Sequence, residues 1–151
     1  MKCIYDTPFG KFAIVSDGMA ITHVLPEERL SSFSDSGADA LTDRAARELD
    51  EYFKGERQNF TVPINPPGTG FQKKVWQTLT MVPYGETRTY KDIAIAAGSE
   101  KAYRAVGLAN NKNPIWIIVP CHRIIGAGGK LTGYGGGLDM KQALLDLEKA
   151  Q

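Results

Sequence analysis

The sequence predicts an α+β protein made of two small domains, residues 1–65 and 66–151. Three observations carry this prediction. Short alternating stretches separated by turn residues fill the first 26 residues, which is typical of an antiparallel sheet. Apolar residues with a helical period dominate the chain after residue 70. Between these regions, residues 63–70 hold three prolines and two glycines, which neither a helix nor a central strand tolerates.

The first domain is expected to be a three-stranded meander followed by one helix. The strands are predicted at Lys2–Asp6, Lys11–Ser16 and Ala20–Leu25. Residues 27–40 are polar and rich in serine, which indicates a loop. Apolar side chains from Ala45 to Phe53 then follow the 3.6-residue period of a helix, with Thr42 as its predicted N-cap and Gly55 just after its end.

The second domain is expected to be mostly helical. Its pattern predicts helices at about 71–79, 90–97, 99–110 and 140–147, a buried strand at 115–119, and glycine-rich turns at 126–129 and 133–137. Thr89 and Asp92 have the spacing of a capping box, and Gly98 ends that helix one residue before Ser99 begins the next. Two short helices joined by a tight glycine turn indicate a helix-turn-helix.

The charged residues divide unequally between the two domains. The chain carries 18 Lys and Arg against 17 Asp and Glu, net +1, but residues 1–65 have a net charge of −4 and residues 66–151 a net charge of +5. From Lys73 to Lys130 the net charge reaches +6. Such a basic region is either a surface for a polyanion or an ordinary solvated face, and charge alone leaves both interpretations open.

Composition excludes two other classes of protein. With 42% hydrophobic residues, the chain has enough apolar material for a core and is not a disordered polyampholyte. Its longest apolar run, Ile115–Val119, has five residues, whereas a membrane-spanning helix needs about 20. The first residues also meet a charge too early for a signal peptide. We therefore expect a protein without membrane contact, located in the cytoplasm, or in the nucleus if the source is a eukaryote.

Of the two cysteines, Cys121 has the surroundings of a reactive thiol. Cys3 lies 118 positions earlier, so there is neither a disulfide framework nor CxxC spacing for zinc. Pro120 is expected to hold the Cys121 thiol on a stiff, non-helical bend, where His122 and Arg123 supply a positive field that favours the thiolate. His122 is expected to reach the sulfur only through a water or a turn. The alternative is an inert packing cysteine.

Six segments follow one another in order between Phe71 and Leu138, within a match that runs to about Glu148. They are Phe71-Gln72-x-x-Val75-Trp76, Pro83-Tyr84-Gly85-Glu86-Thr87 with Tyr90, Arg104-Ala105-Val106-Gly107, Asn113-Pro114, Pro120-Cys121-His122-Arg123-Ile124-Ile125-Gly126, and Gly133-Tyr134-x-Gly136-Gly137-Leu138. This set resembles the O6-alkylguanine-DNA alkyltransferases, also called methylated-DNA–protein-cysteine methyltransferases. The resemblance implies a ribonuclease H-like first domain and a winged helix-turn-helix in the second.

The resemblance also implies a reaction. An alkyl group, such as methyl, passes directly and stoichiometrically from O6 of guanine in DNA to Cys121, which is not regenerated. In the family, Glu148, His122 and a water deprotonate the thiol, and Tyr90 donates a proton to the leaving guanine. No metal or organic cofactor is expected, and the sequence leaves open whether O4-alkylthymine is also a substrate.

The implied partner is double-stranded DNA that contains O6-alkylguanine, bound by a monomer. The target base must be flipped out of the duplex, and the helix-turn-helix does this from the minor groove, with Arg104 replacing the lost base. The other predicted DNA-binding residues are Thr89, Ala102, Tyr103, Ala105 and Gly107. Tyr103 stands where a small residue is usual and Leu108 where glycine or asparagine is common; we expect Tyr103 to add a stacking or phosphate contact.

Four residues are predicted to form the guanine pocket. By the resemblance, Asn113 ties the helix-turn-helix to the active-site loop, and the Val119 carbonyl accepts from the guanine amino group. Tyr134 forms a wall, and the backbone N–H of Gly135, where many relatives have serine, donates to O6.

Three further residues receive structural interpretations. Trp116 replaces a common proline and is expected to pack in the core. Some family members carry zinc in the first domain, but Cys3 and His23 alone do not make a four-ligand site, so no zinc is expected here. Cys3 is expected to be a small packing residue and His23 a strand residue.

Two other functions compete with alkyl transfer. A non-enzymatic alkyltransferase-like protein would bind alkylated guanine without repairing it; such proteins lack the reactive cysteine, so Cys121 argues against this function. A Cys-His hydrolase usually has its histidine far from the cysteine in sequence and needs an oxyanion site, and it would leave the paired helices without a purpose.

Overall fold

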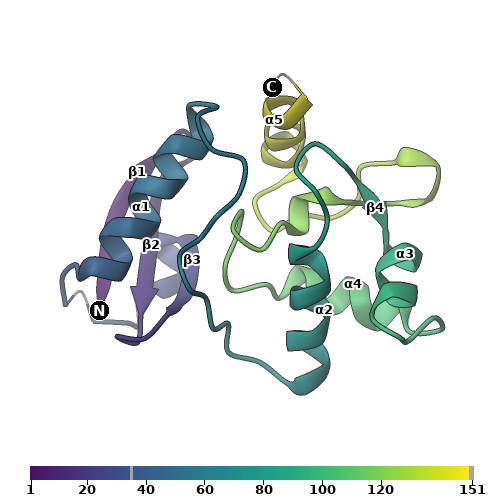
Figure 1. Ribbon diagram of the computed structural model, residues 1–151, viewed down its shortest axis with the longest axis horizontal. Helices are drawn as coiled ribbons and strands as arrows, with labels where there is room; N and C mark the ends of the chain where they lie inside the picture. Colours follow the sequence, from purple (N-terminus) through teal and green to yellow (C-terminus); the bar gives the residue numbers. More distant parts are fainter. Residues whose placement is uncertain (35, 150–151) are drawn as a thin grey trace. The chain divides into compact units, whose positions relative to one another are not determined.

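The computed structural model describes residues 1–34 and 36–149, in two compact units (Figure 1). The first unit contains Met1–Pro67 with Pro114–Trp116, and the second contains Gly68–Asn113 with the described chain from Ile117 onward. Residue 35 of the predicted polar loop and residues 150–151 of the second predicted domain lie outside the described residues. An antiparallel sheet at the N-terminus and a mostly helical second unit confirm the predicted α+β class.

The first unit is built on a three-stranded antiparallel meander. Its strands are β1 (Lys2–Thr7), β2 (Gly10–Ser16) and β3 (Ile21–Pro26), with β2 in the centre. The register pairs Lys2 with Val15 and Ile14 with Val24, so each predicted strand is confirmed within one residue at either end. Helix α1 (Ala40–Phe53) covers one face of this sheet (Figure 1).

Two details of the first unit differ from the prediction. The polar segment is not all loop, because Glu27–Leu30 forms a 3-10 helix whose Leu30 packs on Ala13 and Val15. The N-cap of α1 is Asp39 rather than Thr42. Asp39 accepts from the Thr42 N–H, and the Thr42 hydroxyl accepts from the Asp39 N–H in return, so Thr42 is the second member of a capping box and not its first.

The second unit is mostly helical. Its elements are α2 (Gly70–Thr80), β4 (Arg88–Thr89), α3 (Tyr90–Ala96), α4 (Tyr103–Asn111), a 3-10 turn (Cys121–Arg123), β5 (Ile124–Ile125), a second 3-10 turn (Ala127–Gly129) and α5 (Leu138–Lys149). The predicted capping box between Thr89 and Asp92 is confirmed at the start of α3. Trp76 on α2 donates its indole N–H to the Ala109 carbonyl at 2.8 Å, which joins α2 to α4 inside the core.

Three predictions for the second unit need correction. Helix α4 begins at Tyr103, since its first bond runs from the Val106 N–H to the Ala102 carbonyl, and Ser99 instead forms a separate turn that the Ala102 N–H closes. Residues 115–119 are buried as expected but do not form a strand, since Ile117 has a φ of +74° and breaks the extended backbone. The short parallel pair of β4 with β5 was not predicted; each strand has only two residues, too few for a periodic signal.

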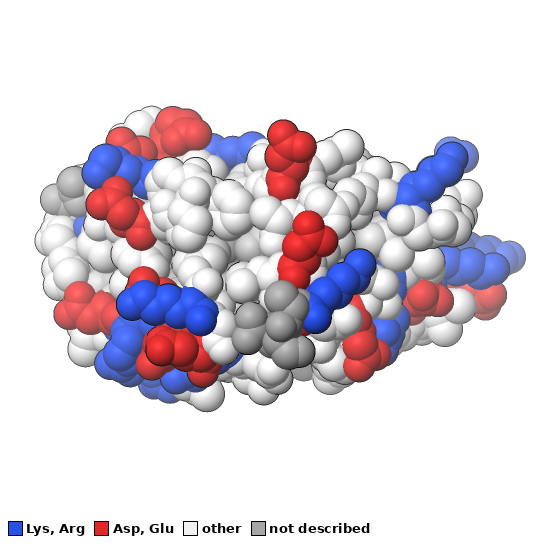
Figure 2. Space-filling view, turned by 90° about the horizontal axis from the view of Figure 1, so that it is seen from above, with Lys and Arg blue, Asp and Glu red and all other residues white. Residues whose placement is uncertain are grey.

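The surface carries both signs of charge. On the face shown in Figure 2, acidic and basic side chains are interspersed, so no single-sign patch covers that face. None of the helices within residues 1–34 and 36–149 is long and apolar enough to cross a membrane.

Candidate active site

A buried carboxylate, Glu148 on α5, organises the reactive region of the second unit. It accepts from Nε and Nη2 of Arg123 at 2.8 and 3.0 Å and lies 2.7 Å from Nε2 of His122. It also accepts from the backbone N–H of Gly85 at 3.2 Å. A buried negative charge is costly unless it is paired and hydrogen-bonded, and these donors meet that requirement. The structure thus brings together two of the predicted catalytic residues, which lie 26 positions apart.

His122 is held as a neutral base. Its complete burial lowers its pKa, against the opposing effect of Glu148, so the imidazole is uncharged at neutral pH. A carboxylate paired with Arg123 can only accept, which places the imidazole proton on Nε2. Nδ1 then keeps its lone pair, and among the described residues it has no hydrogen-bond partner. The ring is therefore ready to accept one proton.

Cys121 is buried, with 3% of its surface exposed. The expected non-helical bend lies at Pro120, whose ψ is +62° and across which the Cys121 N–H bonds the Val119 carbonyl. Cys121 itself begins a 3-10 turn, which was not expected and in which the Arg123 N–H bonds the Pro120 carbonyl. Burial raises the pKa of the thiol to about 11, although a hydrogen bond from Asn113 and the charge of Lys141 act in the opposite direction. The resting thiol is therefore protonated at neutral pH.

The positive charge that acts on Cys121 is not the one expected. Arg123 is committed elsewhere, since it pairs with Glu148 and donates from Nη1 to the Val82 carbonyl at 2.8 Å. The cation that favours the thiolate is Lys141, a buried residue of α5. The sequence pattern of α5 gave no reason to single it out, because a lysine among apolar residues at helical spacing usually faces solvent.

The residues predicted to form the guanine pocket surround this turn in part. Asn113 donates from Nδ2 to the Val119 carbonyl at 2.9 Å. That carbonyl also accepts from Cys121, so both of its lone pairs are occupied, and a guanine amino group would have to displace or share one donor. Tyr134 is buried and Gly135 is exposed in the glycine-rich loop.

Tyr90 connects α3 with two other segments. Its hydroxyl lies 2.9 Å from Oγ1 of Thr132, in the loop before α5. Its ring lies beside Gly107 of α4, where a Cβ atom would stand 3.7 Å from the ring carbons. At that distance the methyl group of an alanine would be in ordinary van der Waals contact with the Tyr90 ring, so glycine is not required here for space.

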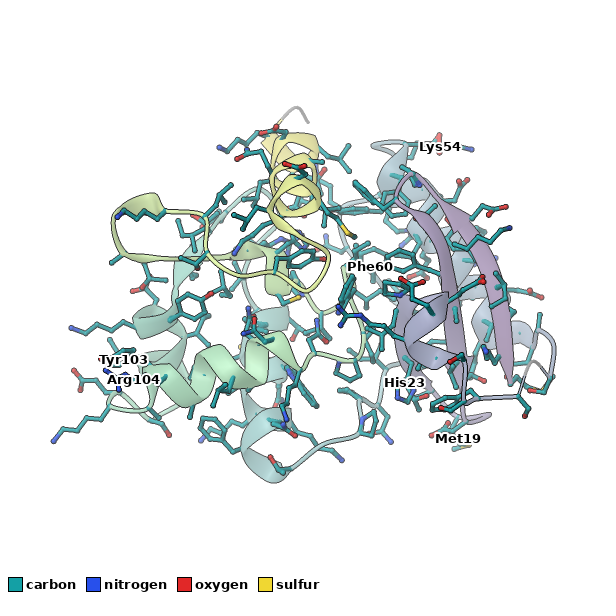
Figure 3. All side chains as sticks on the ribbon, turned by 180° about the vertical axis from the view of Figure 1, so that it is seen from behind. Met19, His23, Lys54, Phe60, Tyr103 and Arg104 are labelled. Carbon is teal, nitrogen blue, oxygen red and sulfur yellow. The ribbon has the colours of Figure 1, made fainter. Side chains whose placement is uncertain are left out.

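The predicted DNA-binding residues lie in α4 and directly before it, apart from Thr89, which ends β4 just before α3. Figure 3 shows Tyr103 and Arg104 at the N-terminal end of α4, with side chains directed away from the ribbon. Tyr103 is 48% exposed, and no carboxylate of the described chain lies within ion-pair distance of Arg104. Ala105 is exposed and Ala102 half-buried beside them. Thr89 caps α3 and is half-buried. Within the described residues, this end of α4 thus presents the small side chains of Ala102 and Ala105 beside Tyr103 and an Arg104 without a carboxylate partner.

Gly85 belongs to the site for a reason that the sequence alone did not reveal. Its φ of +79° is a conformation that side chains disfavour, and a Cβ atom there would lie 3.6 Å from the carbonyl oxygen of Glu148. This backbone geometry lets the Gly85 N–H reach the buried carboxylate. The Pro83-Tyr84-Gly85 turn is thus part of the Glu148 environment as well as the end of α2.

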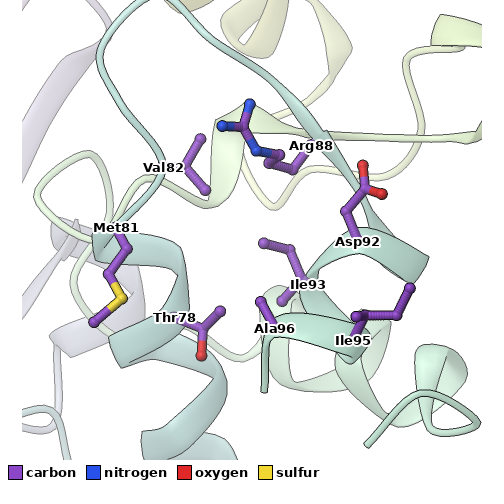
Figure 4. Close-up of a pocket in the computed structure, with 8 residues that line it drawn as sticks. All are labelled: Thr78, Met81, Val82, Arg88, Asp92, Ile93, Ile95 and Ala96. Atoms are coloured by element: carbon purple, nitrogen blue, oxygen red, sulfur yellow. The ribbon is translucent and has the colours of Figure 1, made fainter. Parts of the chain in front are cut away.

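A separate open groove of about 480 Å³ lies between α2 and α3 (Figure 4). Its lining includes Thr78, Met81, Val82, Arg88, Ile93 and Ile95. None of the predicted catalytic or pocket residues lines it. As for metals, no group of three or more His, Cys, Asp or Glu side chains within the described ranges could hold an ion; independence from metals and cofactors stays a prediction.

Comparison with known proteins identifies relatives over the whole chain. Residues 1–66 match the family model "6-O-methylguanine DNA methyltransferase, ribonuclease-like domain", and residues 70–150 match the model of the DNA binding domain of the same proteins. The methylated-DNA–protein-cysteine methyltransferase of Methanosarcina acetivorans is 49% identical over 96% of both chains. That of Methanosarcina barkeri is 61% identical over 105 residues, which are 70% of this chain and 66% of the relative.

A solved structure agrees with these matches. The crystal structure of Mycobacterium tuberculosis OGT in complex with DNA superposes with a TM-score of 0.90 at 47% identity, over 97% of this chain and 91% of that one. The two family models, one for each part of the chain, and the structural match therefore point to the same family. The chain belongs to the 6-O-methylguanine-DNA methyltransferases, the family also called methylated-DNA–protein-cysteine methyltransferases.

Proposed function

We propose that this chain repairs DNA by transferring an alkyl group directly from O6 of guanine to Sγ of Cys121. One observation carries the proposal: a buried thiol lies next in sequence to a neutral histidine whose Nδ1 is open and whose Nε2 is backed by Glu148. Family membership says that such proteins act on methylated DNA. The geometry supplies a base for the thiol proton, which alkyl transfer to sulfur requires.

The proton of Cys121 leaves first. A thiol with a pKa of about 11 is almost fully protonated at pH 7, so it needs a base during the reaction. A water between Sγ and Nδ1 of His122 carries the proton to the imidazole, and the carboxylate of Glu148 stabilises the imidazolium that forms. The pair ends as thiolate and imidazolium with no change in total charge.

The thiolate then displaces guanine from the alkyl carbon. A C–S bond forms as the C–O6 bond breaks, and the electron pair stays on the guanine oxygen. The Tyr90 hydroxyl donates a proton to the leaving base, while Asn113, Val119, Tyr134 and Gly135 hold the base in the pocket. The thioether product has no route back to a thiol, so each molecule repairs one lesion.

Burial of Cys121 requires the base to leave the duplex. Base flipping costs a few kcal/mol of stacking and pairing. Helix α4 offsets this cost by entering the minor groove of double-stranded DNA, with Ala102, Ala105 and Gly107 against the groove. Arg104 fills the gap that the flipped base leaves in the stack. The protein acts as a monomer on a single lesion, without membrane contact, in the cytoplasm or the nucleus.

Mass spectrometry of the reacted protein tests this function. Incubation with a duplex oligomer containing O6-methylguanine should add one CH2, about 14 Da, to the peptide that contains Cys121, and one equivalent of oligomer should exhaust the protein. An unmodified protein that still binds the oligomer would indicate a lesion-binding protein instead. Turnover of an ester or peptide would indicate a hydrolase.

A further inference from the structure

Lys141 is a buried lysine without a part in the proposed proton transfer and alkyl transfer. It has no exposed surface, although it is one of the longest side chains of α5. No carboxylate of the described residues lies within ion-pair distance of it, and the one hydrogen bond that its side chain makes there runs from Nζ to the Thr132 carbonyl at 2.8 Å. Burying an ammonium group without a counter-ion is costly, so its position calls for a functional reason.

Thr132, whose carbonyl accepts from Lys141, is also in contact with Tyr90, the proposed proton donor. Oγ1 of Thr132 lies 2.9 Å from the hydroxyl of Tyr90. The methyl group of Thr132 lies against Gly126, where a Cβ atom would stand only 2.9 Å from it, so glycine leaves the space that this methyl group needs. Thr132 therefore links the two residues: its carbonyl accepts from Lys141, and its hydroxyl lies within hydrogen-bond distance of the Tyr90 phenol.

The charge of Lys141 also acts on Cys121. Burial lowers the pKa of Lys141, whereas the neighbouring thiol acts to raise it. In the other direction, the ammonium group favours the ionised form of Cys121. Among the described residues, Arg123 is paired with Glu148, and Lys141 is the cation whose charge favours the Cys121 thiolate.

We propose that Lys141 is a positioning residue for alkyl transfer, which acts on both ends of the reaction. Through the Thr132 carbonyl it fixes the loop so that the Thr132 hydroxyl orients the Tyr90 phenol toward the leaving base. Through its charge it stabilises the Cys121 thiolate at the moment of attack. The proposal rests on the proposed function and assigns roles to two residues, Lys141 and Thr132, that touch neither the base nor the alkyl group.

Single-turnover kinetics with the O6-methylguanine duplex tests both roles. Lys141→Met should lower the transfer rate constant at saturating DNA at least tenfold, since an opposite charge shifts an ionisation by about one to three pKa units. Thr132→Val should lower the transfer rate constant by up to about tenfold, the effect of one lost hydrogen bond. Thr132→Ser keeps the hydroxyl and should transfer at the wild-type rate. Affinity for the oligomer should not change, because a fully buried lysine has no contact with phosphates. Lys149→Met, on the exposed side of the same helix, should transfer at the wild-type rate.

A second reagent separates the two roles. Alkylation of Cys121 by iodoacetamide, followed on its peptide by mass, needs a thiolate but no proton donor for guanine. Lys141→Met should slow this reaction about tenfold or more, whereas Thr132→Val should leave it at the wild-type rate.

Three results would overturn the inference: Lys141→Met that transfers methyl as fast as wild type, Thr132→Val that does so, or Thr132→Ser that fails to restore the rate. If Lys141→Met does not fold, the Thr132 pair and the iodoacetamide reaction of Thr132→Val still decide the orienting role. A wild-type protein that reacts with iodoacetamide but leaves the oligomer methylated would instead overturn the proposed function.

Discussion

Each compact unit buries a glutamate, and the two glutamates differ in what their partners can do. Glu48 in the first unit is 1% exposed and accepts from the N–H groups of Thr61 and Val62, the Thr61 hydroxyl and Arg44. Although burial acts to raise its pKa, the hydrogen bonds from Thr61 and Val62 hold the pKa of the Glu48 carboxyl below its ordinary value. None of these partners exchanges a proton at neutral pH.

Glu148 in the second unit is 3% exposed and equally well supplied with donors, but one of them is an imidazole. His122 has a second nitrogen that no described residue occupies, so a proton arriving there is stabilised by the carboxylate behind it. A buried carboxylate thus anchors α1 in one unit and supports a base in the other. The difference lies in a single partner, not in burial or charge.

The largest expected effect separates the two histidines of the chain. His122→Gln should lower the methyl transfer rate about 10²- to 10⁴-fold, the usual contribution of a positioned base. His23→Gln in the first unit should not change it, since the His23 side chain, on strand β3, lies against Thr22 and the Phe33 ring. Both rates are measured at saturating O6-methylguanine duplex. Equal rates for the two variants would remove the functional contrast between the units.

Two exposed arginines test where DNA is bound. Arg104→Ala should slow repair of duplex DNA about 10- to 100-fold, because the flipped state loses its replacement for the base. Reaction with the free base O6-benzylguanine should stay at the wild-type rate, since nothing has to be flipped. Arg47→Ala, on α1 of the acidic first unit, serves as the control. A loss of duplex repair in Arg47→Ala of the same size would contradict this account.

The pH dependence tests whether His122 acts as the base. Proton transfer from thiol to imidazole is neutral overall, so the transfer rate should be flat from about pH 7 to 9 and fall at lower pH as His122 becomes protonated. Attack by a preformed thiolate with a pKa of about 11 would instead rise tenfold per pH unit over this range.

The same group makes stability depend on pH in a defined direction. The pKa of His122 is lowered in the folded state, so the unfolded chain binds more protons once the pH falls to about 6.5. Its contribution to the free energy of unfolding is complete above that pH and is lost as the pH falls further. Urea unfolding of His122→Gln should show a smaller loss between about pH 7 and 5 than wild type.

The smallest effects concern helix caps in the two units. Asp39→Ala should lower the free energy of unfolding by about 1 kcal/mol and leave methyl transfer unchanged. Thr89→Ala should cost a similar amount and, in addition, weaken binding to duplex DNA, since Thr89 begins the first helix of the helix-turn-helix. Urea unfolding and fluorescence titration with a labelled duplex measure the two quantities. Undiminished DNA affinity in Thr89→Ala would restrict Thr89 to its capping role.

Local patterns predicted most of the fold. The strands of the meander alternate, α2 and α5 have a helical period, and the Thr89 capping box has a recognisable spacing. The failures arose where tertiary structure overrides local preference. Five apolar residues at 115–119 resemble a strand, but a positive φ at Ile117 breaks it, and no periodicity encodes that angle.

The site was predictable to a different extent. The Pro120-Cys121-His122-Arg123 segment pointed to Cys121 and His122, the family resemblance added Glu148, and the structure supplies the contact between the last two. The sequence could not predict that Arg123 pairs with Glu148 or that Lys141 is buried, because both facts depend on how α5 packs against the turn at Cys121. The charge of a side chain can be read from sequence, whereas its partner depends on packing.

The most direct test compares Glu148→Gln with Glu48→Gln in methyl transfer at saturating O6-methylguanine duplex, with rates corrected for the folded fraction. Each variant removes one buried negative charge, and loss of charged hydrogen bonds should destabilise each by about 1–3 kcal/mol. Glu148→Gln should transfer at least about 100-fold more slowly while binding the oligomer normally, and Glu48→Gln should transfer at the wild-type rate. Wild-type transfer by Glu148→Gln, or an equal loss in Glu48→Gln, would contradict the role assigned to the second glutamate.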